Sequence, residues 1–227
     1  SQSPETSASL LFCKASVLRA TRNYQSTYEI LRQALASAPD DPATRASFQL
    51  EVGRTLYAAG HDFAAIVWLE KAEKESSSIG HTAIYYEALR FLSLAWQAKF
   101  YYANALKYAE KLVEKSSRGE FEHRNRIAHL ELAGLLDLTG QLQGAKAMYL
   151  KGLSLSTRAK VNYHAGQFLS ALLLRTLFEN NVETAEQYLR QLESIDSAKQ
   201  FSYETLLGNA LVAYYKGNKQ LSDQYFS

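Results

Sequence analysis

The side chains in this sequence that could bind a metal or react are few and widely spaced. They are His61, His81, His123, His129, His164 and Cys13. A metal site on a helix needs two ligands three or four residues apart, and no pair of these residues has that spacing. Cys13 has no basic residue in register to favour its thiolate, so we interpret it as a small packing residue. The sequence therefore predicts neither a metal nor another cofactor.

Catalytic motifs are also missing from the sequence. Gly134, Gly140 and Gly144 are spread along a helical hairpin and form no phosphate-binding loop. No nucleophile elbow or kinase signature occurs. Glu70 and Glu73 are expected on an exposed helix face, where paired carboxylates are solvated. We expect a protein that does not catalyse a reaction.

The composition predicts an all-α chain. Apolar residues make up 47% of the 227 residues, which is enough for a folded core. The only prolines are Pro4, Pro39 and Pro42, so nothing forces a helix to break after the first fifth of the chain. Asp41 followed by Pro42 predicts a helix start, with an N-cap and a proline at the first helical position.

Charge and hydropathy limit the kinds of partner. The net charge is +2 and no basic stripe stands out, which argues against a nucleic-acid binder. No apolar run is long enough to span a membrane. The chain begins at Ser1 without a visible signal peptide. The compartment therefore stays open between the cytoplasm and, if a signal or anchor segment was removed before Ser1, the periplasm.

A repeat of 40 residues organises the chain. Alanines in one local pattern recur 40 residues apart, at Ala65, Ala105, Ala145 and Ala185. Thr27 and Ser222 continue the series at its two ends. Twelve residues before these six positions stand Ala15, Gly53, Ser93, Ala133, Leu173 and Ala210. Apolar residues follow both positions at helical spacing, so each unit is predicted to be a helix A, a turn and a helix B that cross closely at the small residues.

This pattern resembles the tetratricopeptide repeat, which has a small residue in helix A, an alanine in helix B and an aromatic or leucine four residues later. Gly53, Ala65 and Leu69 match it. The resemblance covers nearly the whole chain and implies a right-handed superhelical solenoid of antiparallel helix hairpins. Lengthened repeats of this kind occur in bacterial signalling and regulatory proteins.

The repeat register places one domain over residues 1–227 with about six units. Their predicted bounds are 8–40, 46–80, 86–120, 126–160, 166–197 and 203–227, the last unit being incomplete. A period of 40 in place of the usual length of about 34 predicts longer helices or longer connections, with the extra residues between the repeats, around Glu75–His81, Lys115–Asn125 and Leu155–Tyr163. Tyr225 and Phe226 would be left half covered at the end of the last unit, so we expect that the chain continues or that another chain covers this edge.

In the tetratricopeptide-repeat family that this pattern resembles, helix A lines a concave groove. The residues of each helix A that would face the groove are therefore the candidate partner-binding site. We select Arg19, Leu50, Arg54, Tyr57, Glu87, Arg90, Leu94, Gln97, Leu130, Asp137, Leu174 and Tyr214. The first part of this set carries three arginines and the second part is mainly apolar, and the lysines and asparagines of a chaperone-tail clamp are absent. One hypothesis is an amphipathic helix or apolar peptide in the groove, with the arginines holding an acidic group. The other is that a further helix covers the apolar positions, from missing flanking segments of this chain or from a second copy.

A second candidate surface is the edge formed by the connections between units. Arg118 and Arg158 are 40 residues apart and occupy the same repeat position. The nearby basic residues are His123, Arg124, Arg126, Lys160 and His164. A basic edge could meet an acidic partner or a membrane surface; the alternative is a set of exposed turns kept soluble by charge.

Together these features favour a non-catalytic protein- or peptide-recognition module, a sensor or regulatory segment of a larger signalling or transcription-regulating protein. An alternative is an oligomerisation scaffold that self-associates through its apolar late helices. A more remote alternative is a helical-repeat binder of nucleic acid or a small ligand, although per-repeat base-reading pairs are not evident.

Overall fold

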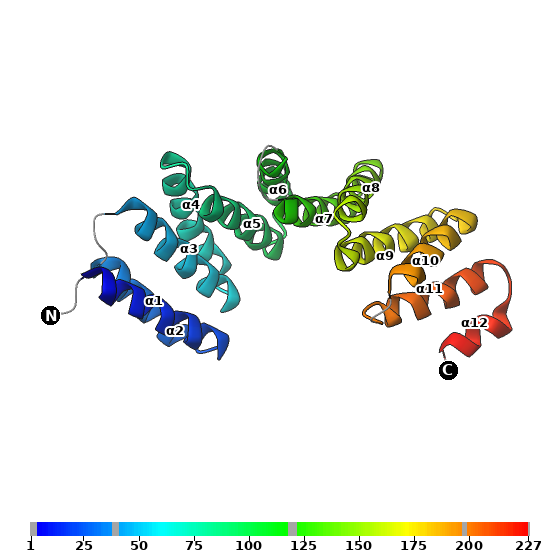
Figure 1. Ribbon diagram of the computed structural model, residues 1–227, viewed down its shortest axis with the longest axis horizontal. Coiled ribbons are helices and arrows are strands. Elements are labelled where there is room, and N and C mark those ends of the chain that lie inside the picture. The colour runs from blue at the N-terminus through cyan, green and yellow to red at the C-terminus, as the bar shows by residue number, and fades with distance from the viewer. Residues whose placement is uncertain (1–3, 38–40, 118–121, 197–198, 227) are drawn as a thin grey trace. The chain divides into compact units, whose positions relative to one another are not determined.

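The computed structural model describes residues 4–37, 41–117, 122–196 and 199–226. All twelve regular elements in these residues are α-helices, which confirms the all-α prediction (Figure 1). They are α1 (Pro4–Ala20), α2 (Tyr24–Ser37), α3 (Pro42–Ala58), α4 (Asp62–Ser78), α5 (Thr82–Ala98), α6 (Tyr102–Ser116), α7 (Glu122–Leu138), α8 (Leu142–Arg158), α9 (Asn162–Phe178), α10 (Val182–Ile195), α11 (Ser202–Tyr215) and α12 (Lys219–Phe226).

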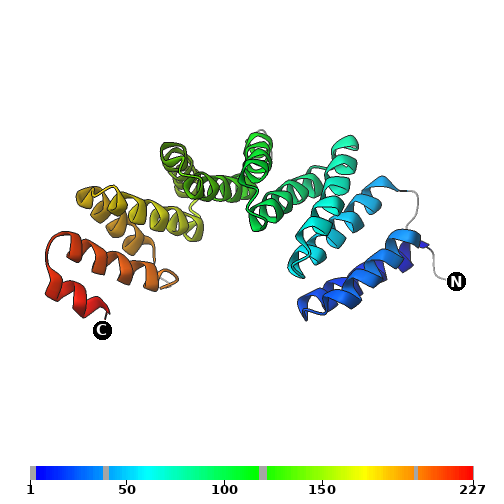
Figure 2. The same cartoon turned by 180° about the vertical axis from the view of Figure 1, so that it is seen from behind.

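The chain divides into two compact units, which we call unit 1 (Ser1–Arg118) and unit 2 (Gly119–Ser227). Unit 1 holds α1 to α6 and unit 2 holds α7 to α12. Within each unit every odd-numbered helix packs against the even-numbered helix that follows it, as the two opposite views show (Figures 1 and 2). Each such pair is a hairpin of a helix A and a helix B. The single-domain organisation and the bounds of the six repeats inferred from the sequence stay predictions.

The residues that lengthen the repeat are mostly helical. Helix α3 begins at Pro42, four residues before the predicted start of the second repeat at residue 46. Asp41 caps this helix by accepting a 2.8 Å hydrogen bond from the Thr44 backbone N–H. The predicted helix start is therefore confirmed. Helix α4 continues to Ser78, which leaves only residues 79–81 before α5 begins. Of the two alternatives, longer helices hold at this junction, because the helices extend by about one further turn and so include the extra residues.

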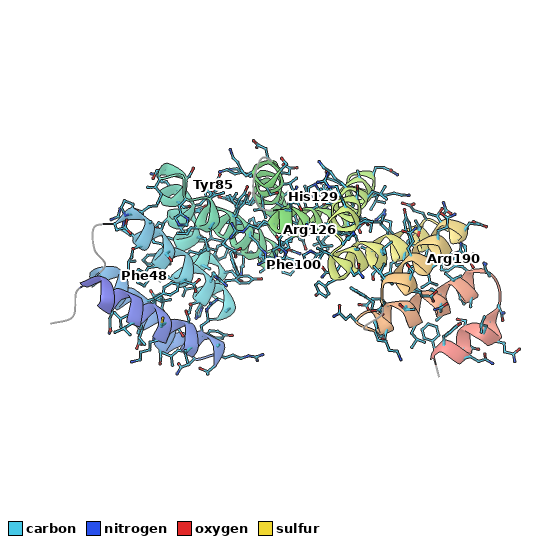
Figure 3. The ribbon with its side chains drawn as sticks, viewed as in Figure 1. Phe48, Tyr85, Phe100, Arg126, His129 and Arg190 are labelled. Carbon is cyan, nitrogen blue, oxygen red and sulfur yellow. The ribbon has the colours of Figure 1, made fainter. Side chains whose placement is uncertain are left out.

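The turns inside the hairpins share one backbone geometry. At Gly60, whose φ is 79°, the Gly60 N–H donates to the Tyr57 carbonyl at 2.9 Å and the His61 N–H donates to the Leu56 carbonyl at 2.8 Å. This pattern ends a helix with one residue in the left-handed conformation. Within the six hairpin turns, the residues in that conformation are Arg22, Gly60, Phe100, Gly140, Asn180 and Gly217. Phe100, labelled in Figure 3, is the one bulky apolar residue among them, and its Cβ makes the conformation costly.

The small residues lie where helix A and helix B cross. Ala65, Ala105, Ala145 and Ala185 are fully buried. The Ser93 hydroxyl of α5 donates a 3.0 Å hydrogen bond to the Ala105 carbonyl of α6, across the crossing. This contact confirms the predicted close approach, because a hydroxyl can reach a backbone carbonyl in the facing helix only where the helix axes are near each other.

Candidate functional site

The predicted binding residues of unit 1 gather around one cluster on its A helices. We call it the arginine–aromatic cluster: Arg19 of α1, Glu51, Arg54 and Tyr57 of α3, and Phe91 of α5. Residues 51 and 54 are three apart, as are 54 and 57, so the α3 members lie on neighbouring faces of the helix. The ring centroids of Tyr57 and Phe91 are 5.8 Å apart in an edge-to-face contact. The Arg54 guanidinium carbon lies 4.9 Å from the Phe91 ring centroid.

One carboxylate serves two arginines in this cluster. Glu51 is 7% exposed, and its oxygens lie 2.7 Å from Arg54 Nη1 and 3.2 Å from Arg19 Nη2. The three groups therefore keep one positive charge in excess. Among the described residues, the buried Nε of Arg54 has no hydrogen-bond partner. A partly buried guanidinium that lies over an aromatic ring is suited to a carboxylate ligand.

The remaining predicted residues of unit 1 have different surroundings. Arg90 lies over the same aromatic ring, 5.6 Å from the Phe91 centroid, and extends the cluster along α5. The other three predicted α5 residues are half-buried: Glu87, Leu94 and Gln97. Leu50 is 6% exposed and packs in the core of unit 1, so it presents little surface to a partner and its binding role stays a prediction.

Unit 2 holds the other four predicted binding residues, and the one charged residue among them is paired. Asp137 forms an ion pair with Arg175 and accepts a 3.4 Å hydrogen bond from the Tyr149 hydroxyl. Burial raises the pKa of Tyr149 to about 12, and the Asp137 carboxylate acts in the same direction. Leu130 and Leu174 are half-buried. Tyr214, which is 62% exposed on α11, is the one of the four that is open to solvent.

The sequence reasoning missed three residues that shape these sites: Glu51, Phe91 and Arg175. Each lies next to or near a selected groove position but is not itself at one. The spacing of Glu51 three residues before Arg54 was a usable signal, because opposite charges at that spacing pair on a helix surface. Arg175 carried a comparable signal, since Glu179 follows it by four residues, whereas Phe91 carried none, since Arg54 comes from another helix.

The predicted basic edge is only partly present. Arg118 lies outside the described residues, and Arg158 is exposed at the end of α8. Arg126 is 6% exposed, so the expectation of an exposed basic residue there is corrected. It donates from Nε to His164 Nδ1 at 3.2 Å.

In the ranges that the structure describes, no group of three or more histidine, cysteine or acidic side chains is placed to hold a metal ion. None of the helices in those ranges is both long enough and apolar enough to cross a membrane.

No family model matches this chain, and no curated protein matches it in sequence. Solved structures do. The apo form of RapI matches with a TM-score of 0.84 and 16% identity over 99% of this chain, which spans 64% of the RapI chain. Repeats described as TPR-like, from a putative kinesin light chain of Podospora anserina, match with a TM-score of 0.72 and 18% identity over 88% of this chain and 99% of theirs. This chain has the tetratricopeptide-like helical-repeat fold.

A third structure, a Rap protein complexed with Competence and Sporulation Factor, matches with a TM-score of 0.69 and 10% identity. The match covers 99% of this chain and 64% of that protein. At these identities the tetratricopeptide-like likeness is one of fold, and function has to be argued from the sites.

Proposed function

We propose that this tetratricopeptide-like chain is a non-catalytic module that binds a segment of another protein, or a peptide, through the arginine–aromatic cluster. The observation that carries the proposal is the sharing of Glu51 by Arg19 and Arg54, which leaves a positive charge beside the half-buried rings of Tyr57 and Phe91. An acidic side chain of the partner pairs with Arg54, and a neighbouring apolar side chain lies on Tyr57 and Phe91. Arginine and aromatic residues are the types that contribute most to binding at protein interfaces.

A peptide selection tests this proposal. A random peptide library selected on the whole chain should enrich sequences that hold an Asp or Glu next to an apolar residue. Arg54→Ala should weaken binding of a selected peptide about tenfold, because a charge-assisted pair is lost. Arg158→Ala removes an exposed arginine of unit 2 and serves as the matched control. Selected peptides that bind Arg54→Ala as tightly as the parent chain would refute the site.

The binding is further proposed to be regulatory. The support is the fold likeness to a Rap protein that was solved with Competence and Sporulation Factor bound. A regulatory module changes state when its ligand binds. Hydrogen exchange should therefore slow in helices of unit 2 as well as in α1, α3 and α5 when a selected peptide is added. Slowing confined to those three helices would indicate a passive binding module.

A second candidate function is self-association through α11. Tyr203, Leu206 and Tyr214 are 72%, 47% and 62% exposed on this helix, more apolar surface than a single solvated helix usually shows. Light scattering over a range of concentrations should then show a dimer that Leu206→Ser weakens. A mass that stays monomeric at every concentration would remove this candidate.

A further inference from the structure

Four side chains of unit 2 meet in a second cluster. We call them the histidine–arginine cluster: His123 and Arg126 of α7, and Tyr163 and His164 of α9. The two imidazole rings are stacked, with centroids 5.1 Å apart and planes 28° from parallel. Tyr163 contacts His164 with centroids 5.7 Å apart. Arg126 is labelled on α7 in Figure 3.

Arg126 is a buried cation whose ion pair, in the described part of the chain, is long and involves an exposed carboxylate. It is 6% exposed, and an arginine keeps its charge at any pH at which the protein is folded. The nearest carboxylate in the described part of the chain is Glu122, 3.8 Å away on a side chain that is 68% exposed. Arg175, another arginine whose side chain is nearly buried, pairs with both Asp137 and Glu179. Buried charges are normally compensated at close range, so the long pair with Glu122 leaves Arg126 only weakly compensated among the described residues.

The cluster offers hydrogen-bond donors to a ligand. His164 Nδ1 accepts from Arg126, which assigns the proton of the neutral His164 ring to Nε2. The guanidinium keeps further N–H groups, and Tyr163 adds a hydroxyl at a residue that is 53% exposed. A ligand that fits must supply negative charge and several acceptor oxygens. A phosphate monoester supplies both, with a charge near −2 and three acceptor oxygens.

We propose that the histidine–arginine cluster is a binding site for a phosphate monoester group. The Arg126 guanidinium supplies the permanent charge, and the stacked imidazoles add charge when they are protonated. The site is independent of the peptide site in unit 1, since it uses none of the same residues.

The titration of the cluster agrees with this assignment. Burial, the His123 ring and the Arg126 guanidinium all lower the pKa of His164. Glu122 is the one carboxylate close to Arg126, and Lys151 of α8 acts on His129 instead. A dianion beside His164 opposes the two positive neighbours, so it raises the pKa of His164 on binding. Phosphate should therefore bind more tightly as the pH falls from about 8 to about 6.5.

Histidine ring resonances in NMR spectra of the whole chain test the proposal. Inorganic phosphate and O-phosphoserine should each shift His123 and His164 saturably at constant ionic strength, while His61 and His81 of unit 1 stay fixed. Chloride at the same ionic strength should shift none of the four. Resonances of His123 and His164 that do not saturate with phosphate would overturn the proposal. Binding of inorganic phosphate without O-phosphoserine would overturn the assignment to a monoester.

Two variants localise the site. Arg126→Gln should weaken phosphate binding by tenfold or more, while Arg190→Gln, which removes an exposed arginine of α10 in the same unit, should leave it unchanged. His123 is exposed, so His123→Asn keeps the fold if Arg126→Gln does not, and it should weaken binding about threefold. Undiminished phosphate binding in a folded Arg126→Gln or His123→Asn chain contradicts the site.

Discussion

Two arginines, one in each unit, show how the partner of a cation determines its effect on stability and on ligand binding. Arg54 in unit 1 is partly exposed and has a carboxylate, Glu51, at 2.7 Å. Arg126 in unit 2 is more deeply buried and has an imidazole instead. Arg54 thus belongs to a paired network with one charge in excess, whereas Arg126 is a cation whose compensation is incomplete. The first arrangement stabilises the fold and can also accept an acidic ligand; the second costs stability unless an anion binds.

The largest effect on stability is expected from adding a methyl group at a close helix contact in unit 2. A Cβ at Gly152 of α8 would overlap the ring of Phe168, which is fully buried. Gly152→Ala should lower the free energy of unfolding by about 3 kcal/mol, because a rigid ring cannot move aside in a packed core. Urea denaturation measures this.

Two controls define that effect. Gly144→Ala lies on the same helix, where a Cβ meets only Leu136 at 3.5 Å, and should change stability little. Gly53→Ala in unit 1 meets Leu69, whose flexible side chain can adjust, so its cost should be intermediate. Equal losses for Gly152→Ala and Gly53→Ala would contradict this difference between the units.

Removing a charge should affect the stability of the two arginine sites to different extents. Glu51→Gln leaves Arg19 and Arg54 without their shared carboxylate and should destabilise the protein by about 2 kcal/mol, less than for a fully buried pair because both arginines are partly exposed. Arg126→Gln removes a poorly compensated charge and should cost less than about 1 kcal/mol in the absence of phosphate. Chemical denaturation of both variants measures the contrast. A greater loss for Arg126→Gln would show that His164 and Glu122 compensate Arg126 fully.

Acid should weaken unit 2 through its buried histidine. His129, labelled in Figure 3, is fully buried, and burial lowers its pKa. Because the unfolded chain then binds the proton more readily, this contribution to stability is complete above the unfolded pKa of about 6.5 and is lost as the pH falls through the folded value. His129→Leu should therefore reduce the loss of melting temperature between pH 7 and about 5.5, although His164 still contributes in the same direction.

The matched control for that prediction lies in unit 1. Gln49 occupies the same repeat position as His129 and does not titrate. Gln49→Leu should shift the melting temperature equally at both pH values. A pH dependence in the His129→Leu chain as steep as in the parent would exclude His129 as its source.

The smallest effect concerns the hairpin turns. Phe100 of unit 1 has φ 63° and is 77% exposed, whereas Asn180 occupies the equivalent turn of unit 2. Phe100→Asn should raise the free energy of unfolding by about 0.5–1 kcal/mol, because asparagine adopts the left-handed conformation at lower cost. Asn180→Phe is the reciprocal change and should lower it by a similar amount. Thermal melts of the two variants measure both shifts, and shifts of the same sign would contradict the account.

The fold could be predicted because its determinants are local and repeated. Ala65 and its three counterparts recur at a fixed spacing in amphipathic segments, and the Asp41–Pro42 start uses only neighbouring residues. The length of the connections could not be predicted in the same way. A left-handed residue such as Lys160 can close a turn without glycine, so the junction after α8 gave no sign of being short.

The sequence by itself determined that this chain forms helix hairpins, where their helices cross and which residues lie on helix A. Only the tertiary structure decided which of those residues meet. Glu51 reaches Arg19 of another hairpin, and Arg126 reaches His164 across 38 positions of the sequence. Such pairs depend on how neighbouring helices are rotated and shifted relative to each other. The packing of the core determines this arrangement, and the residue spacing along one helix does not predict it.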